Sequence, residues 1–239
     1  TSGDDNTAIG FKALTVLTTG SNNTGIGARA LLSNTTGGAN TAIGENALYQ
    51  NTTANFNTAV GYQSLDANTE GASNTGIGAD ALSANTTGAE NVALGKGALG
   101  ANTTASYNVA VGQGAGDAIT TGNYNVAIGR SALTTLTTNA ANTAVGGTAL
   151  SANTAANNTA VGYASLAANT TATNNTAVGY SSLAANTTGA NNSALGSLSL
   201  DANTTGGANT AIGKQALTTN TTGSFNTAVG TGSLALATT

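Results

Sequence analysis

The sequence predicts an all-β chain that folds as a parallel β-solenoid, a β-roll of about 14 coils with 17 residues per coil. One short phrase recurs at a fixed spacing, glycine and β-branched residues recur inside each copy, and charged residues keep to certain places in the repeat. Glycine, asparagine and β-branched residues at these intervals oppose a helix and favour short strands separated by turns. A 17-residue unit is also too short for a two-helix repeat of about 34 residues.

The repeated phrase is the pentapeptide from Asn57 to Gly61, which reads Asn-Thr-Ala-Val-Gly. Its asparagine opens fourteen units, and we number the positions of a unit from 1 to 17 starting at this residue. The period is broken once, by a deletion of one residue inside 153–157, which we expect to lie in a turn. The units form a single predicted solenoid domain over residues 1–239 and begin at Asn6, Asn23, Asn40, Asn57, Asn74, Asn91, Asn108, Asn125, Asn142, Asn158, Asn175, Asn192, Asn209 and Asn226.

Positions 1 to 4 of each unit are predicted to form a short strand. Successive side chains of a strand point to opposite faces, so positions 2 and 4 share one face and the small residue at position 3 points the other way. We expect the aliphatic residue at position 4, such as Val60, to point inward. The face of position 3, as at Ala59, would then pack closely against a second sheet or against other chains around a three-fold axis.

Position 5 is glycine in all fourteen units. We expect these glycines, Gly61 and Gly78 among them, to open the corner after each strand, because glycine enters φ > 0 without steric cost. A second turn is expected near position 15, where glycine is frequent.

Asparagine is expected to form structural ladders at two positions. It is invariant at position 1, as in Asn57 and Asn74, and frequent at position 12, as in Asn85 and Asn186. Position 12 also accepts aliphatic residues, which indicates an inward-facing site, and a buried unpaired amide would cost about 1–3 kcal/mol. Each amide is therefore expected to bond to the next coil. The replacements at position 12 are Leu17, Ile119, Leu136 and, in the last unit, Ala237.

The Asn-Thr-Thr segments at position 12 are also sequons for N-glycosylation, which is the alternative interpretation of these asparagines. Sugars on neighbouring coils about 5 Å apart would collide. An inward asparagine would also be out of reach, so we favour the ladder.

The charged residues mark the exposed corners, because Lys, Arg, Asp and Glu are almost never buried unpaired. They fall only at positions 6, 7, 10, 14, 16 and 17, and none falls at positions 1 to 5, 8, 9, 12 or 13. We therefore expect two or three exposed corners in each coil.

The composition excludes several classes of function. Only 6% of the residues are charged, which together with the recurrent aliphatic residues argues against a disordered chain. Without His or Cys the common nucleophile–base pairs are missing, so we expect no catalytic residues and no enzyme. The nine carboxylates are scattered and the repeat differs from the calcium-binding nonapeptide, so we expect no metal site and no cofactor. Five basic residues are too few for a nucleic-acid footprint, and no apolar run reaches the about 20 residues that span a bilayer.

Aromatic residues occupy corner positions and are the candidates for surface binding or for an interface. An exposed tyrosine can stack on a sugar or pack against another subunit. The simpler interpretation is that these rings cover turns or mediate subunit packing. The candidates are Tyr62, Tyr163 and Tyr180 at position 6 and Phe56, Tyr107 and Tyr124 at position 17.

Columns of threonine on a flat solenoid face raise ice binding as a third function. Ice-binding faces usually carry two outward threonines on one strand, separated by one residue. Here paired threonines such as Thr86 and Thr87 are adjacent and are expected to point opposite ways, which weakens that hypothesis.

The Asn-Thr-Ala-Val-Gly phrase, followed by Ala or Ser three residues after the glycine, resembles the head repeats of trimeric autotransporter adhesins. It is still more similar to the Asn-Thr-Ala-(Ile/Val)-Gly-x-x-Ala-Leu-x-x-Asn-Thr-Thr-Gly arrays of phage-type tail-fibre proteins. The resemblance covers Asn6 to Leu234 and implies a left-handed β-roll, a homotrimer and an extracellular, cell-surface or virion location. Adhesin units are usually shorter than 17 residues, and the extra residues fall on the Asn-Thr-Thr-Gly side.

We therefore expect a structural protein, a rigid extracellular or virion fibre segment that assembles with copies of itself. The two ends of the chain lie in nearly the same repeat phase without a polar capping segment, which predicts excision from a longer fibre or head-to-tail polymerisation. The alternative is a surface adhesin that binds carbohydrate or a host surface through its corner tyrosines.

Overall fold

The computed structural model describes residues 3–236 and confirms the predicted fold class, an all-β parallel β-solenoid. The described residues hold fourteen strands of three residues and no helix, and each strand occupies positions 2 to 4 of one repeat. They fall into two compact units, unit 1 (Thr1–Asn123) and unit 2 (Tyr124–Thr239).

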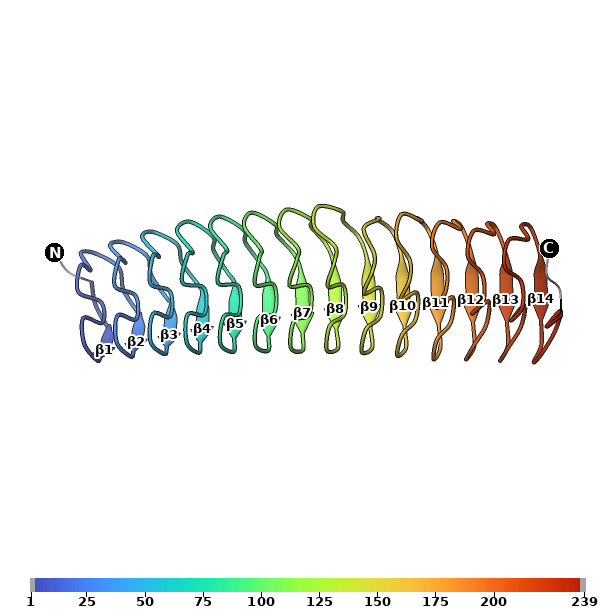
Figure 1. Ribbon diagram of the computed structural model, residues 1–239. Coiled ribbons are helices and arrows are strands. Elements are labelled where there is room, and N and C mark those ends of the chain that lie inside the picture. Colours follow the sequence, from blue (N-terminus) through green and yellow to red (C-terminus); the bar gives the residue numbers. More distant parts are fainter. Residues whose placement is uncertain (1–2, 237–239) are drawn as a thin grey trace. The chain divides into compact units, whose positions relative to one another are not determined.

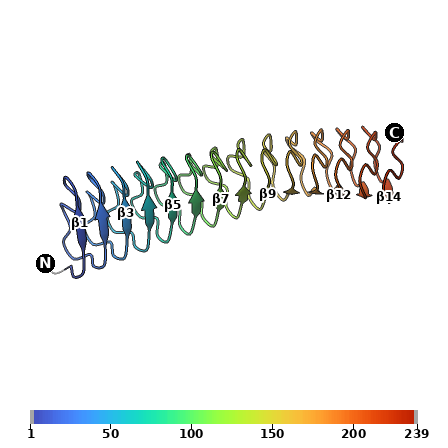
Figure 2. The same ribbon diagram turned by 90° about the horizontal axis from the view of Figure 1, so that it is seen from below.

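The strands of unit 1 stack in chain order, each parallel to the next (Figures 1 and 2). Equivalent residues pair without offset, as Thr58 does with Thr75 and Ala59 with Gly76. Each position of the repeat therefore forms a column that runs from coil to coil. The strands are β1 (Thr7–Ile9), β2 (Thr24–Ile26), β3 (Thr41–Ile43), β4 (Thr58–Val60), β5 (Thr75–Ile77), β6 (Val92–Leu94) and β7 (Val109–Val111).

Unit 2 repeats this arrangement. The repeat that contains β9 is one residue short, yet β10 pairs with β9 in register, with Thr159 opposite Thr143. The deletion inside 153–157 is absorbed in a bend outside the strands, as predicted. The strands are β8 (Val126–Ile128), β9 (Thr143–Val145), β10 (Thr159–Val161), β11 (Thr176–Val178), β12 (Ser193–Leu195), β13 (Thr210–Ile212) and β14 (Thr227–Val229).

The prediction that position 4 points inward is wrong, and so is the packing predicted for position 3. The middle residue of the strand enters the coil: Ala59 is fully buried, while Thr58 and Val60 on either side of it are partly exposed. The same pattern holds in every strand except β1, where all three residues are exposed. A three-residue strand has a single inward side chain, and only a small one fits beside the leucine and asparagines that fill the coil.

Five further positions fill the interior of the coil. In the repeat that begins with Asn57, the other buried residues are this asparagine, Ser64 at position 8, Leu65 at position 9, Asn68 at position 12 and Gly71 at position 15. Burying one leucine stabilises a coil by about 1.5–3 kcal/mol, so hydrogen bonds must hold the rest of this interior. No charged residue among residues 3–236 is buried, which confirms the predicted charged corners.

The backbone passes through left-handed conformations at positions 7, 9 and 17, as in Gln63 (φ 51°), Leu65 (φ 52°) and Ser73 (φ 59°). Such conformations cost a non-glycine residue about 1–2 kcal/mol. Bonds between coils hold them in place: the Leu65 N–H donates to the Ala81 carbonyl and the Gln63 N–H to the Glu45 carbonyl, both at 3.0 Å.

Candidate functional site

The asparagines at position 12 form a hydrogen-bonded ladder inside each unit, as predicted. Each side-chain amide donates to the side-chain oxygen of the preceding coil: Asn85 Nδ2 to Asn68 Oδ1 at 2.8 Å, and Asn186 Nδ2 to Asn169 Oδ1 at 2.9 Å. These asparagines are fully buried, so the sequons that contain them are inaccessible in the folded chain. The rungs are Asn34, Asn51, Asn68, Asn85 and Asn102 in unit 1 and Asn153, Asn169, Asn186, Asn203 and Asn220 in unit 2.

The asparagines at position 1 form a second column with a different bonding pattern. The Asn74 backbone N–H donates to Asn57 Oδ1 at 2.9 Å, so each side-chain oxygen accepts from the backbone of the next coil. The side-chain nitrogen turns the other way, and Asn57 Nδ2 donates to the Gly71 carbonyl of its own coil at 2.9 Å. Most asparagines at this position therefore link two coils and also bond across their own coil, whereas the side-chain nitrogen of Asn175 is buried without a hydrogen-bond partner.

In most coils one backbone carbonyl joins the two asparagine columns. The Gly88 carbonyl, at position 15, accepts from Asn74 Nδ2 at 2.8 Å and from Asn85 Nδ2 at 2.9 Å. This shared acceptor fastens the coil across its interior, while the ladders fasten it to its neighbours. The sequence indicates both columns but not this acceptor, because a carbonyl is present at every position and leaves no compositional signal.

The position-12 ladder of unit 1 ends where an aliphatic residue replaces asparagine. Asn102 Oδ1 is buried without a hydrogen-bond partner, because the next coil presents Ile119 in place of an amide. Ile119 and, in unit 2, Leu136 are buried, which confirms that position 12 faces inward. Ala237, the predicted replacement in the last repeat, lies outside the described residues.

Asn68→Leu is expected to lower the free energy of unfolding by about 1–3 kcal/mol more than Asn102→Leu does. The first change cuts the ladder in its middle and leaves Asn51 Oδ1 without its donor. The second change shortens the ladder by one rung, because it removes one unpaired oxygen and creates another on Asn85. Chemical denaturation of both variants measures the difference, and equal losses would contradict a continuous ladder.

The glycines at position 5 form the corner after each strand, as predicted. Gly61 and Gly78 have φ angles of 134° and 131°, which L side chains rarely adopt. A Cβ atom on Gly61 would also lie 2.6 Å from the carbonyl oxygen of Gly78, at the same corner of the next coil. The backbone conformation and the stacking of the coils both require glycine here.

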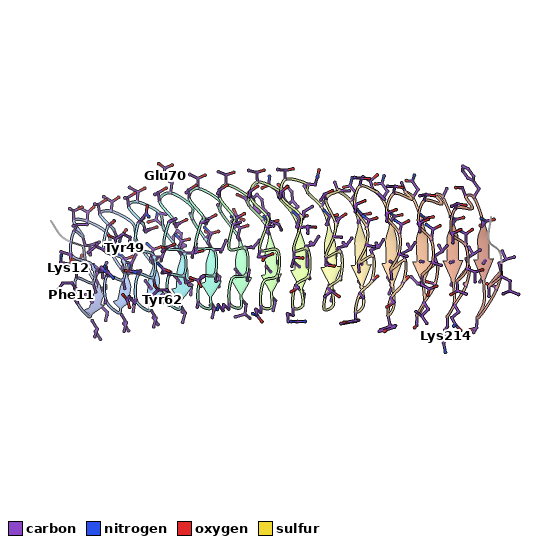
Figure 3. All side chains as sticks on the ribbon, viewed as in Figure 1. Phe11, Lys12, Tyr49, Tyr62, Glu70 and Lys214 are labelled. Carbon is purple, nitrogen blue, oxygen red and sulfur yellow. The ribbon has the colours of Figure 1, made fainter. Side chains whose placement is uncertain are left out.

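The six candidate aromatic residues lie on the surface, and their part in binding stays a prediction. Figure 3 shows Tyr62 on the same rim of unit 1 as Phe11 and Lys12, with Glu70 on the opposite rim. The Lys12 ammonium lies 5.4 Å from the centre of the Phe11 ring. The exposed candidates are Phe56, Tyr62, Tyr107, Tyr124, Tyr163 and Tyr180.

Two of these aromatic residues are brought together in unit 2. The rings of Tyr163 and Tyr180 stack with their centroids 6.0 Å apart and 11° between their planes. Tyr163 also lies over Gly147 of the preceding coil, where an added Cβ atom would come within 3.3 Å of the ring. The signal for this pair in the sequence is that tyrosine occupies position 6 in two consecutive repeats.

Two carboxyl groups at position 10 have perturbed acidity. Partial burial raises the pKa of Asp66 above the ordinary value of 3.8, against the opposing hydrogen bond from the Ala67 N–H, and the charge of Asp80 raises it further. Burial also raises the pKa of Asp117. The pKa of each group therefore lies higher in the folded chain than that of an ordinary aspartic acid.

Asp66→Asn is expected to stabilise the chain at neutral pH. Since the folded-state pKa of Asp66 lies above the unfolded value, its charge lowers the free energy of unfolding as pH rises through the folded pKa. The gain from the substitution should therefore vanish below the unfolded pKa of about 4. Denaturation at acidic and neutral pH measures this, with Glu70→Gln as a control for the loss of one charge at an exposed corner. An equal gain at both pH values would contradict the linkage.

No pocket opens in the surface of residues 3–236, and no three His, Cys, Asp or Glu residues there are grouped to hold a metal ion. This part of the chain contains no helix with the length and apolar character that a membrane crossing requires. No protein-family model matches the chain, and no curated protein matches it. The described residues form two asparagine columns in the interior of the coils and a surface that repeats from coil to coil.

Proposed function

We propose that this chain is a structural fibre segment, extracellular or on a virion, whose stacked coils supply rigidity and which assembles with copies of itself. The observation that carries the proposal is the pair of buried asparagine columns. They add side-chain bonds such as Asn85 Nδ2 to Asn68 Oδ1 to the backbone bonds between coils. A stack held in this way has a stability that adds up from coil to coil, and local opening must break bonds to both neighbours.

The resemblance of the repeat to adhesin-head and tail-fibre arrays supports the same function. A left-handed coil, a homotrimer and head-to-tail growth are part of the proposal. Electron microscopy of the purified chain over a range of concentrations tests self-assembly. Filaments whose length or number grows with concentration are expected, and a chain that stays monomeric at the highest concentration would overturn the self-assembly.

A surface adhesin is the second candidate, and the stacked Tyr163–Tyr180 pair favours it. Both rings are more than half exposed, and an exposed aromatic surface can stack on a sugar. Glycan-array binding that is lost in Tyr163→Ala/Tyr180→Ala but kept in Tyr62→Ala would support this candidate. An array without any bound glycan would contradict it.

A further inference from the structure

A row of position-6 residues runs along unit 2 at the corner after each strand, and we call it the tyrosine rim. Its members, one from each of six consecutive coils, are Arg130, Gly147, Tyr163, Tyr180, Ser197 and Lys214. The two aromatic and the two basic side chains are exposed, and Figure 3 shows Lys214 projecting from this edge of the unit. One cation therefore lies two coils before the stacked tyrosines and the other lies two coils after them.

The tyrosine rim carries positive charge. Arg130 and Lys214 are the two basic residues of unit 2. Its one acidic residue, Asp201, lies at position 10 and accepts a hydrogen bond from the Thr218 hydroxyl at 2.6 Å. Neither Arg130 nor Lys214 forms an ion pair among residues 3–236. Since the rim holds two positive charges and no negative one, it attracts anions.

Unit 1 has a tyrosine at the same position in a different electrostatic environment. Tyr62 follows Glu45, at position 6 of the preceding coil, and precedes Asp80, at position 7 of the next coil. Carboxylates therefore flank Tyr62, whereas Gly147 and Ser197 flank the tyrosine pair of unit 2. An anion bound on the Tyr62 ring would be repelled, so position 6 alone does not make an anion site.

The two tyrosines of the rim form an aromatic platform with hydroxyl groups beside it. Their rings are nearly parallel, and Tyr163 packs over Gly147, where the absence of a side chain leaves room for the ring. At position 7, Thr148 and Ser181 carry hydroxyls that make no hydrogen bond with the rest of residues 3–236. An aromatic face can pack against the C–H surface of a sugar, and free hydroxyls can bond to its hydroxyl groups.

We infer that the tyrosine rim binds an acidic glycan, with sugar rings on Tyr163 and Tyr180 and carboxylate or sulfate groups at the two cations. The inference rests on the adhesin candidate and names the class of its ligand. Arg130 and Lys214 lie five coils apart along the chain's repeat. At the spacing of stacked strands this is about 24 Å. The rim therefore accommodates several sugars of one chain, and each cation contacts a different sugar.

The backbone of the tyrosine rim does not suit a peptide. The N–H groups at position 7 already donate to position-6 carbonyls of the preceding coil, as Ser181 does to Tyr163 at 3.0 Å. A peptide therefore finds no open strand edge here to extend, and no pocket in residues 3–236 would take its side chains. Two cations are also few for a nucleic acid, whose binding strengthens with each phosphate that is neutralised. A glycan on an exposed aromatic platform needs neither a pocket nor a strand edge.

Two matched pairs of glycans test the inference. Oligogalacturonate carries a carboxylate on each sugar, and its methyl ester is the same chain without charge. Dextran sulfate and dextran form the corresponding sulfate pair. Biolayer interferometry of the full chain on these four immobilised glycans, at one salt concentration, should show binding to at least one acidic member. Its neutral partner should bind about fivefold or more weakly, as expected for the loss of two exposed ionic contacts.

Two charge variants locate the binding. Arg130→Gln/Lys214→Gln removes the cations of the rim, and the control Lys12→Gln/Lys96→Gln removes two cations from positions 7 and 6 of unit 1, so both variants have the same net charge. The dissociation constant of the rim variant for the acidic glycan should rise about fivefold or more, and that of the control should match wild type. All four residues are exposed, so both variants should keep the fold, which circular dichroism checks.

The outcomes separate this inference from the adhesin candidate. Equal binding to acidic and neutral glycans, lost in Tyr163→Ala/Tyr180→Ala, would overturn the acidic ligand and leave the adhesin standing. Equal weakening of the rim variant and the control would overturn the rim as the site. Absence of binding to all four glycans would overturn the inference, and a glycan array without any ligand would overturn the adhesin as well. Tighter binding of oligothymidylate than of either acidic glycan, reduced in the rim variant, would replace the glycan by a nucleic acid.

Discussion

Ala59→Asp is expected to lower the free energy of unfolding by about 3–5 kcal/mol, because it places an uncompensated charge inside the coil. Ala59 is fully buried, at the middle of β4, and the repeat around it offers no cation inside the coil. The adjacent change Val60→Asp is expected to cost about 1 kcal/mol, the usual range of strand preferences, because Val60 points outward. Thermal and chemical denaturation of the two variants measures the difference.

The two substitutions control for each other, since they introduce the same side chain one residue apart. Equal destabilisation would show that the strand orientation is wrong. If Val60→Asp lowered the free energy of unfolding more than Ala59→Asp, the side chain at position 4 would point inward, as the sequence pattern predicts.

Gly95→Ala is expected to lower the free energy of unfolding by roughly 2–6 kcal/mol, through backbone strain and overpacking together. Gly95 has a φ of 134°, and an added Cβ atom would lie 2.7 Å from the carbonyl carbon and oxygen of Gly112 in the next coil. Relief of this clash would require the two coils to separate at the corner, where the Gly112 N–H donates to the Leu94 carbonyl at 2.8 Å.

Gly97→Ala, two residues further on, is the matched control. Gly97 also has a positive φ, of 65°, but an added Cβ atom would meet nothing within 4 Å. The expected cost is about 1–2 kcal/mol, the penalty of the left-handed conformation alone. If both alanines proved equally tolerated, contact between successive corners could not be the reason for the invariant glycine.

Much of the fold follows from the sequence because a repeat reports the same geometry many times. The invariant glycine at position 5 identifies the corner seen at Gly61, since only a special backbone requirement excludes every other residue there. The exchange of asparagine for leucine or isoleucine at position 12 identifies an interior site, as found at Ile119. The charged residues identify the exterior because burying them unpaired is too unfavourable.

The orientation of the strands could not be obtained in the same way. Alternation along a strand separates two faces but does not say which of them is inside. The usual assumption that the larger apolar residue is buried fails at Val60, because Leu65 and two asparagines leave room only for the methyl group of Ala59. The positive φ of Leu65 could not be predicted either, because leucine has no preference for that conformation and contacts between coils impose it.

The candidate surface sites could be predicted only in part from the sequence. Corner positions predict exposure of Tyr163 and Tyr180, but the stacking of their rings and the contact of Tyr163 with Gly147 follow from how neighbouring coils lie against each other. The exposure of the aliphatic residues at position 4, such as Leu94, was missed altogether, because it follows from the strand orientation.

Hydrogen exchange of side-chain amides, followed by NMR, tests the central claim most directly. The account predicts slow exchange for Asn68, Asn85 and Asn186, which are fully buried and bonded from coil to coil. Asn22 and Asn174, which are exposed at position 17 of their repeats, should exchange much faster. Equal and fast exchange at all five would contradict the buried ladders on which the stacking of the coils depends.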